Sequence, residues 1–322
     1  MTENNISLHW LKVSDHCAGQ RVDNFLSFYL KTVPKSMIYR MIRIGKVRVN
    51  KKRIKFQYRL KIGDLLKIPA IKYVKIRQSC MCNISEMMFL QNTVIYEDEH
   101  LLVLNKPSGI SVHGGGDNKL QLNIIDALRM LRPKIRFLWL VHRLDRDTSG
   151  LLLIAKSRIV LIKLHEQLRL QKIQKTYLAI VYGSWDTHIT SISAPLFKKK
   201  DYIKNINVVF IDSKFGKLAQ TCFQVKERFK NIATLLNIIP ITGRTHQIRV
   251  HTQYAQCPII GDHVYGKQKV NVQFKKLGWN RLFLHASTLC FIHPCTEEKM
   301  NISAPVDQSF YDCLSFLRKL VN

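Results

Sequence analysis

Acidic residues are scarce in this chain of 322 residues. It holds 22 aspartates and glutamates against 51 lysines and arginines, which gives a formal net charge of +29. Such an excess of positive charge favours acidic partners, and nucleic acid is the usual one. Lysine and isoleucine are used heavily throughout, so codon bias can account for part of the excess. The location of the cations is therefore more informative than their number.

Long apolar segments and ordered cysteine patterns are also lacking. No segment is long enough to span a bilayer, and the N-terminus does not resemble a signal peptide. The eight cysteines are irregularly spaced, which is typical of reduced thiols. Cys290, His293 and Cys295 lie close together but lack the paired spacing of a structural zinc site. We expect a cytoplasmic protein without a metal site.

Hydrophobic residues make up 46% of the chain, enough for a packed core. Residues 18–80 have the pattern of a small basic module. Pro34-Lys35-Ser36 begins its second helix, with Ser36 a suitable N-cap, and Gly45 can end that helix in a left-handed conformation. A short strand at Val47–Val49 precedes a turn at Lys51–Arg53.

The cations of this module gather on one helix face and on the adjoining turn. Arginine at several of these positions, in a chain richer in lysine, favours contact with phosphate. A solvated helix with incidental lysines and arginines is the alternative interpretation. The candidate RNA-binding residues are Lys35, Arg40, Arg43, Lys46, Arg48, Lys51, Lys52 and Arg53.

The rest of the chain divides into three parts. Residues 1–17 are expected to be an N-terminal tail, and residues 81–93, which show no clear periodicity, a linker. In residues 94–322, short apolar runs typical of buried strands alternate with segments of helical spacing. This pattern predicts an α+β domain built on a central sheet.

Polar residues are dense from His142 to Gly150, directly before an apolar strand. Polar groups cannot enter a core unless they are paired, so a salt-bridged turn would also explain them. A kinase catalytic loop is excluded because Leu144 separates the arginine from the aspartate and no Asp-Phe-Gly follows. The serine hydrolase elbow is absent. A glycosidase needs two separated carboxylates, and Asp145 and Asp147 are too close in sequence.

Three further stretches are polar or rich in glycine. Asn105–Gly116 does not end as a Walker loop does, and it is compatible with a plain flexible loop. Lys175–Gly183 has only the pattern of a strand. In Ile241–His251, Thr245 can cap a helix that runs through Ala255. The cations on that helix need an acidic partner if they are buried, and Asp145 is the natural candidate.

These stretches carry two resemblances. Gln20–Leu26, Ile44–Asn50 and Gly63-Asp64 resemble the S4 RNA-binding domain. The second resemblance is to the large-ribosomal-subunit pseudouridine synthase family, with its subfamilies A, C and D. The matching stretches are His142–Gly150, Lys175–Tyr177, Gly216–Thr221, Gly243–His251 and Leu284–Ala286. Val33–Arg40 and Val49–Lys55 look most like subfamily C. The chain departs from the family at Cys257, where many members have histidine, and at Lys198–Val208.

The resemblance implies a role for each residue of the catalytic domain. Asp145 matches the catalytic carboxylate, and Tyr177 the residue that stacks on the target uracil and can act as a base. Arg249 matches the cation that pairs with the aspartate. Arg143, with His142, matches residues that hold the flipped-out nucleotide. The implied fold is an S4 domain followed by a catalytic domain whose mixed, mainly antiparallel sheet is flanked by helices.

The implied activity is the isomerisation of uridine to pseudouridine in 23S ribosomal RNA, with no cofactor and no metal. The expected partner is that RNA or a large-subunit assembly intermediate, bound by a monomer away from any membrane. The alternative is a non-catalytic RNA-binding or ribosome-assembly factor with an inert synthase domain. A nucleobase deaminase is disfavoured because its zinc signature is missing.

Overall fold

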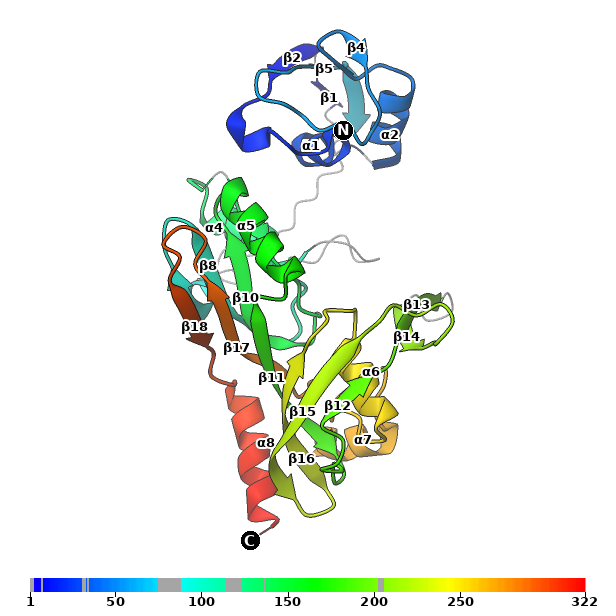
Figure 1. The fold of residues 1–322 in the computed structure, drawn as a ribbon, viewed down its shortest axis with the longest axis vertical. Coiled ribbons are helices and arrows are strands. Elements are labelled where there is room, and N and C mark those ends of the chain that lie inside the picture. The colour runs from blue at the N-terminus through cyan, green and yellow to red at the C-terminus, as the bar shows by residue number, and fades with distance from the viewer. Residues whose placement is uncertain are drawn as a thin grey trace. The chain divides into compact units, whose positions relative to one another are not determined.

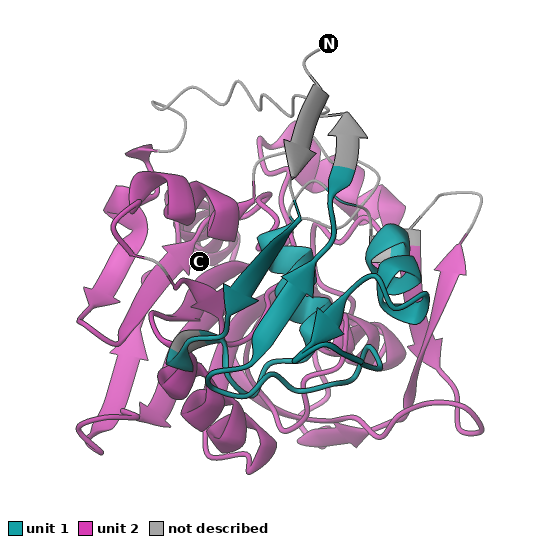
Figure 2. Ribbon diagram, turned by 90° about the horizontal axis from the view of Figure 1, so that it is seen from above, with its two compact units in different colours: residues 1–81 teal, residues 82–322 magenta. Residues whose placement is uncertain are grey.

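The chain folds into two compact units, Met1–Met81 and Cys82–Asn322, which are shown in Figures 1 and 2. No helix in the described part of the chain is long and apolar enough to cross a membrane. The computed structural model describes residues 3–6, 8–30, 33, 35–74, 88–113, 123–135, 137–201 and 206–321. The expected linker lies largely outside these residues, as do Gly114–Gly116 of the glycine-rich stretch.

The first unit packs two helices against a small antiparallel sheet with the strand order β2-β5-β3-β4. Two further strands, β1 and β6, pair with each other. The strands are β1 (Glu3–Ile6), β2 (His9–Lys12), β3 (Arg48–Val49), β4 (Lys52–Arg53), β5 (Leu65–Ile68) and β6 (Ile71–Val74). The helices are α1 (Val22–Tyr29) and α2 (Lys35–Arg43), with a 3-10 turn at Asp15–Cys17. Residues 1–17, expected to be a tail, thus contain two paired strands.

In this unit, one local prediction from the sequence is confirmed and two are wrong. Gly45 has φ +73° just after α2, so the predicted left-handed helix end is confirmed. The proposed cap at Ser36 is wrong, because α2 begins at Lys35 and Ser36 lies within its first turn. The turn lies at Asn50 and Lys51, with φ of 47° and 67°, because a two-residue hairpin favours positive φ at both positions. The expected turn residues Lys52 and Arg53 therefore lie in a strand, β4.

The second unit is built on a sheet of ten described strands. Its main path is β12-β15-β16-β11-β17-β10-β8-β7, with β18 beside β17 and β9 beside β10. Every pair is antiparallel except β10 and β17, so the mixed, mainly antiparallel sheet is confirmed. Its strands are β7 (Val94–Glu97), β8 (Leu101–Lys106), β9 (Trp139–Leu140), β10 (Ser149–Ala155), β11 (Gln174–Tyr182), β12 (Ser191–Ser193), β15 (Gln220–Phe229), β16 (Ala233–Pro240), β17 (Leu284–Ile292) and β18 (Lys299–Ser303).

Helices and a separate hairpin complete this unit (Figure 1). The hairpin pairs β13 (Leu196–Asp201) with β14 (Ile206–Ile211). A 3-10 turn at Gln91–Thr93 precedes β7. The helices are α4 (Ile124–Leu131), α5 (Arg158–Arg169), α6 (Gln247–Tyr254), α7 (Gln268–Lys276) and α8 (Gln308–Lys319).

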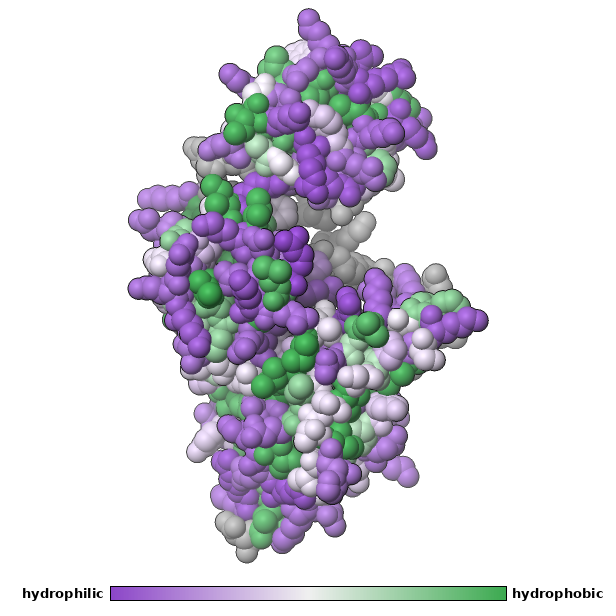
Figure 3. Space-filling view, in the orientation of Figure 1, coloured by the Kyte–Doolittle hydropathy of each residue, from purple (hydrophilic) through white to green (hydrophobic). Residues whose placement is uncertain are grey.

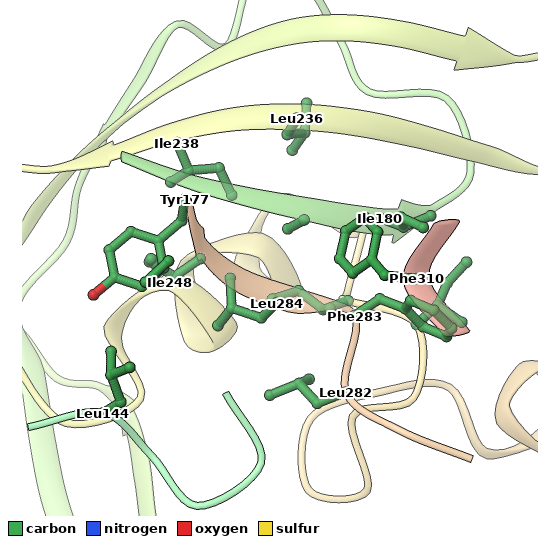
Figure 4. Close-up of a cluster of buried hydrophobic side chains, with 14 of the residues drawn as sticks. Leu144, Tyr177, Ile180, Leu236, Ile238, Ile248, Leu282, Phe283, Leu284 and Phe310 are labelled. Atoms are coloured by element: carbon green, nitrogen blue, oxygen red, sulfur yellow. The ribbon is translucent and has the colours of Figure 1, made fainter. Parts of the chain in front are cut away.

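Both faces of the central strands are covered, which explains their continuous apolar sequences. In β10, Leu152 and Ile154 pack into one core, shared with residues of α4, α6 and α8. Leu151 and Leu153 point the other way into a second core, shared with residues of α5. Figure 4 shows part of the first core. The strand that follows the polar stretch is thus packed on both of its faces.

Gly150 allows the one parallel pair among the described strands. Its φ is +106°, and a Cβ on it would overlap the backbone carbonyl of Ala286. Gly150 pairs with Ala286, and Ser149 with His285. This close approach, which any larger residue would block, fixes the end of the polar stretch against β17.

Candidate active site

A cavity of about 400 Å³ lies in the second unit and brings together the predicted residues of this domain. Its walls come from the polar stretch before β10, from β11, from the loop after β16 and from the first turn of α6. The five predicted residues that line it are His142, Arg143, Asp145, Tyr177 and Arg249. Segments more than 100 residues apart in sequence therefore meet at one site.

Asp145 presents its carboxylate to this cavity. The side chain is 19% exposed, and the preceding Leu144 is buried in the core and anchors the loop. The carboxylate Oδ2 lies 3.5 Å from Nη1 of Arg249 and 3.8 Å from Nε2 of His246. Asp145 is thus close to a fixed cation while it remains accessible from the cavity.

Arg249 is held by another acid. Its Nε and Nη2 donate hydrogen bonds of 2.7 and 2.8 Å to the two carboxylate oxygens of Asp262. The guanidinium also lies over the ring of Tyr265, 5.0 Å from its centre. Burial disfavours the charged arginine, but the hydrogen bonds and the charge of Asp262 outweigh it and raise the pKa of Arg249.

Asp262 is the residue that sequence reasoning missed. It is 1% exposed, and its Oδ1 also accepts backbone N–H bonds from Val264 and Tyr265. Burial would raise the pKa of Asp262, but Arg249 and these amides hold it below its usual range. Asp145, the expected acidic partner, does lie 3.5 Å from Arg249, but the two short hydrogen bonds of the guanidinium go to Asp262. The available signal was an aspartate 13 residues after Arg249, within Gly261–Gly266.

The start of α6 differs from the prediction. The helix begins at Gln247, and His246 occupies the cap position with φ 53° and no side-chain cap. The predicted cap at Thr245 is wrong because the Gln247 side chain organises this turn instead. Its amide accepts hydrogen bonds from Thr242 and from the backbone of Arg244, and donates two more to β15. Burial lowers the pKa of His246, so a neutral imidazole faces Asp145.

Tyr177 lies on β11 with its side chain packed beside Ile238, Ile248 and Leu284, and its hydroxyl points out of this cluster (Figure 4). It is 8% exposed. Burial, together with the charge of Asp145, raises the pKa of Tyr177. The hydroxyl therefore stays protonated at neutral pH, which suits a stacking surface and does not favour an ionised phenolate as a base.

Arg143 and His142 lie side by side in sequence but differ in environment. Arg143 is exposed at the cavity. His142 is enclosed, and its Nε2 accepts a hydrogen bond from the backbone N–H of Leu153. Burial, with the charge of Lys175, lowers the pKa of His142 to about 3, so its imidazole is neutral. Its Nδ1 is buried and has no hydrogen-bond partner among the described residues.

Lys106 connects the glycine-rich stretch to the loop of Asp145. It is fully buried, and its Nζ donates to the carbonyl oxygens of Pro107, Ile110 and Arg146. Burial lowers the pKa of Lys106 to about 7. The described part of the glycine-rich stretch, Asn105–His113, therefore supports the loop of Asp145.

The basic residues of the first unit are mostly free for a ligand. Hydrophilic residues cover most of the face of this unit that Figure 3 presents. Arg48 is half-buried and donates to the carbonyl of Gly45, which stabilises the turn. The side chain of Lys35 lies outside the described residues. The exposed cations, none with a described carboxylate partner, are Arg40, Arg43, Lys46, Lys51, Lys52 and Arg53.

The Cys290, His293 and Cys295 group has another role. The His293 ring bonds through Nε2 to Asp98, and its Nδ1 accepts backbone N–H bonds from Cys295 and Thr296. Both ring nitrogens are thus used within the fold. In the described part of the chain, no group of three or more histidine, cysteine or acidic residues is arranged to hold a metal ion.

Comparisons with known proteins agree with the geometry. Residues 100–254 match the RNA pseudouridylate synthase family, and residues 20–66 match the S4 domain. Ribosomal large subunit pseudouridine synthase C of Escherichia coli (strain K12) is 51% identical over 304 residues, 94% of each chain. The protein of the same name from Haemophilus ducreyi is 49% identical over 320 residues, 98% of each chain. The solved structure of human RNA pseudouridylate synthase domain containing 4 covers 73% of this chain and 96% of its own, with a TM-score of 0.59 and 29% identity.

Proposed function

The chain belongs to the ribosomal large subunit pseudouridine synthases that carry an S4 domain, and from this we propose that it isomerises specific uridines of 23S ribosomal RNA with Asp145 as the catalytic carboxylate. Relatives over nearly the whole chain are named for the large ribosomal subunit, and this supports the substrate. We further propose that the enzyme acts in the cytoplasm as a monomer, on free RNA or on an assembly intermediate.

The proposed reaction breaks the N1–C1′ bond of uridine, turns the uracil and rejoins it through C5. No atom enters or leaves, so the chain's own side chains can carry every step. Asp145 can attack C1′, or it can help to remove the C2′ proton and so form a glycal. Arg249, 3.5 Å away, favours the carboxylate anion that both routes need.

Retention of the detached uracil is the second requirement. Water that reached the sugar would leave an abasic site, so the base must stay covered while it turns. The ring of Tyr177, flanked by Ile248 and Leu284, offers a flat apolar surface for stacking. Stacking of a base on an aromatic ring is worth roughly 1–3 kcal/mol. Tyr177 is thus proposed to hold the base rather than to ionise.

Access to the sugar requires that the uridine leaves its stack. This costs a few kcal/mol. Arg143, exposed at the cavity, is proposed to fill the gap that the nucleotide leaves. The basic surface of the S4 domain, proposed to extend over residues 18–80, offsets the cost through phosphate contacts. His142 supports the site as a neutral, half-buried residue.

One observation carries the proposal: a partly exposed carboxylate, Asp145, shares a cavity with Arg249 and Tyr177. The test uses cells that lack the gene and express wild type or Asp145→Asn. Carbodiimide primer extension should detect pseudouridines in large-subunit RNA only with wild type, while purified Asp145→Asn still binds the RNA. Asp147→Asn is the matched control, since Asp147 lies two residues away and pairs with the exposed Arg146. Pseudouridines formed by Asp145→Asn would instead rule out this carboxylate.

The alternative is a non-catalytic ribosome-assembly factor. In that case the pseudouridines of large-subunit RNA would be the same with and without the gene, and Asp145→Asn would support ribosome assembly as well as wild type does.

A further inference from the structure

Lys175 lines the active-site cavity, but the proposed mechanism does not use it. It lies on β11 two residues before Tyr177, and alternate residues of a strand share a face. Its Nζ lies 3.9 Å from the point that a Cβ on Gly243 would occupy. The side chain thus reaches from β11 to the loop before α6.

Lys175 has no partner for its charge among the described residues. It is half-buried in the cavity wall and makes no ion pair and no side-chain hydrogen bond there. Burial alone lowers the pKa of Lys175. Other cations of this unit that are withdrawn from solvent have partners: Arg249 pairs with Asp262, Lys106 with three carbonyls and Lys156 with Glu97. Because an ammonium partly withdrawn from water is costly without a partner, an anion that enters the cavity would stabilise Lys175.

The neighbouring His142 does not compensate this charge. The Nε2 of His142 accepts the N–H of Leu153, so the single proton of the neutral ring is on Nδ1. This N–H is buried next to the backbone of Arg143 and does not open into the cavity. The charge of Lys175 is close enough to lower the pKa of His142. Lys175 thus has a neutral neighbour and no counter-charge there.

Lys175 lies in the cavity without an ion pair to the catalytic carboxylate. Among the described residues, Asp145 lies within ion-pair distance of Arg249 and of His246 instead. The charge of Lys175 is thus left for a bound group.

We infer that Lys175 binds a backbone phosphate next to the everted uridine. A phosphodiester carries a permanent negative charge at every nucleotide of RNA, whereas the uracil of bound uridine offers neutral carbonyl oxygens. Arg143 and Arg244 also line the cavity, and among the described residues of its wall Asp145 alone carries a carboxylate. The inference rests on the proposed function, because it takes the RNA substrate from it.

Replacement of Lys175 by methionine separates this role from a structural one. Met fills a similar volume and removes a half-buried charge that has no described partner, so the melting temperature should stay equal or rise. The value of kcat/KM for RNA should fall roughly 10- to 100-fold, as expected for the loss of a hydrogen bond to a charged group. Lys175→Arg should retain most of the activity. Lys172→Met is the control, because Lys172 is exposed three residues away and lies outside the cavity wall.

The decisive experiment neutralises the phosphates of the RNA one at a time. Methylphosphonates are placed within two nucleotides of the target uridine, in a fragment of 23S RNA that wild type modifies. At one of these positions, the methylphosphonate should lower kcat/KM of wild type as much as the Lys175→Met substitution lowers it with native RNA. The same methylphosphonate should not lower kcat/KM of Lys175→Met any further. The inference would be overturned if methylphosphonates at every position lowered kcat/KM of wild type and of Lys175→Met equally. It would also be overturned if Lys175→Met were less stable than wild type or unfolded.

The result can be separated from the fate of the proposed function. If wild type forms no pseudouridine in any fragment, the proposed function fails. The same comparison of native and methylphosphonate RNA can then be made by filter binding, with wild type, Lys175→Met and Lys172→Met. A phosphate position at which only wild type and Lys172→Met lose affinity would still support the phosphate site.

Discussion

Arg249 donates its two short hydrogen bonds to Asp262 and approaches Asp145 only to 3.5 Å. The buried guanidinium is therefore neutralised and oriented by a carboxylate that takes no part in the proposed reaction. Its third nitrogen faces Asp145 at a longer distance. This leaves the oxygens of Asp145 free to meet the sugar.

Asp262→Asn should weaken both the fold and the reaction. Loss of one partner of a buried pair typically costs about 3–5 kcal/mol, because the other charge is left without compensation. Arg249 should then turn toward Asp145, and single-turnover rates should fall at least about tenfold. Urea unfolding and rapid quench measure the two effects. Glu166→Gln, in an exposed pair with Arg169, is the control and should change stability by less than about 1 kcal/mol. An unchanged single-turnover rate in Asp262→Asn would show that Asp262 does not position Arg249 for the reaction.

Lys106→Met should destabilise the protein, in contrast to Lys175→Met. Lys106 donates to the carbonyls of Pro107, Ile110 and Arg146. The variant leaves the carbonyls of the half-buried Pro107 and Ile110 without a described donor, whereas that of Arg146 keeps the N–H of Gly109. Each unsatisfied group costs about 1–3 kcal/mol, so the free energy of unfolding should fall by about 2 kcal/mol or more. Thermal and urea unfolding of the two lysine variants provide the comparison. If the two substitutions changed the free energy of unfolding equally, the different hydrogen-bond partners of the two lysines would not explain their roles.

Tyr177 should make the protein less stable in alkali. Its pKa is raised in the folded state, so above the ordinary value of about 10 the unfolded chain loses this proton first. The stability that Tyr177 contributes is thus complete below pH 10 and is lost as the pH rises further. Tyr177→Phe keeps the ring and should show a smaller alkaline loss in urea unfolding. Identical profiles of the two proteins from pH 9 to 11 would show that the hydroxyl is not shielded.

His142 should contribute to acid unfolding. Its pKa is lowered to about 3, while an unfolded histidine titrates at about 6.5. The stability from the neutral buried ring is therefore present above pH 6.5 and is lost as the pH falls toward 3, by up to about 1.4 kcal/mol per pH unit. His142→Asn should flatten this slope, while His285, with a pKa of about 4, acts equally in both proteins. A slope unchanged by the substitution would refute the burial argument.

The S4 cations should affect binding and its salt dependence, not the chemical step. Arg40→Gln and Lys52→Gln each remove one exposed charge. Each should reduce the slope of log affinity against log salt by about 0.7–0.9, the value for one phosphate contact. Filter binding at several salt concentrations gives the slope, and single-turnover rates at saturating enzyme should stay unchanged. Lys230→Gln, in the other unit, is a control for the loss of total charge.

The sequence could predict those parts of the structure that depend on local patterns. The apolar runs of β8 and β10 are continuous because both faces are buried, and they could be recognised as strands directly. The residues around the cavity were predicted from the resemblance to a family. Without that resemblance, the polar turn at Asp145 could equally be a salt-bridged turn, and Tyr177 could equally be a core residue of its strand.

Partners that are distant in sequence could not be predicted in this way. Asp262 is identified only when the fold turns Arg249 toward it, and the pairing of β1 with β6 joins residues almost 70 positions apart. The caps of α2 and α6 were wrong for a related reason. Ser36 and Thr245 are suitable cap residues, but the side chain of Gln247 and the left-handed His246 determine where α6 begins.

The parallel pairing of Gly150 with Ala286 has a consequence for the newly made chain. One anchor of the loop of Asp145 is a strand that the ribosome synthesises more than 130 residues later. Contacts of such sequence separation form late in folding. A nascent chain therefore exposes its RNA-binding module long before its cavity can close, and it becomes able to modify RNA only when translation of the last strands is complete.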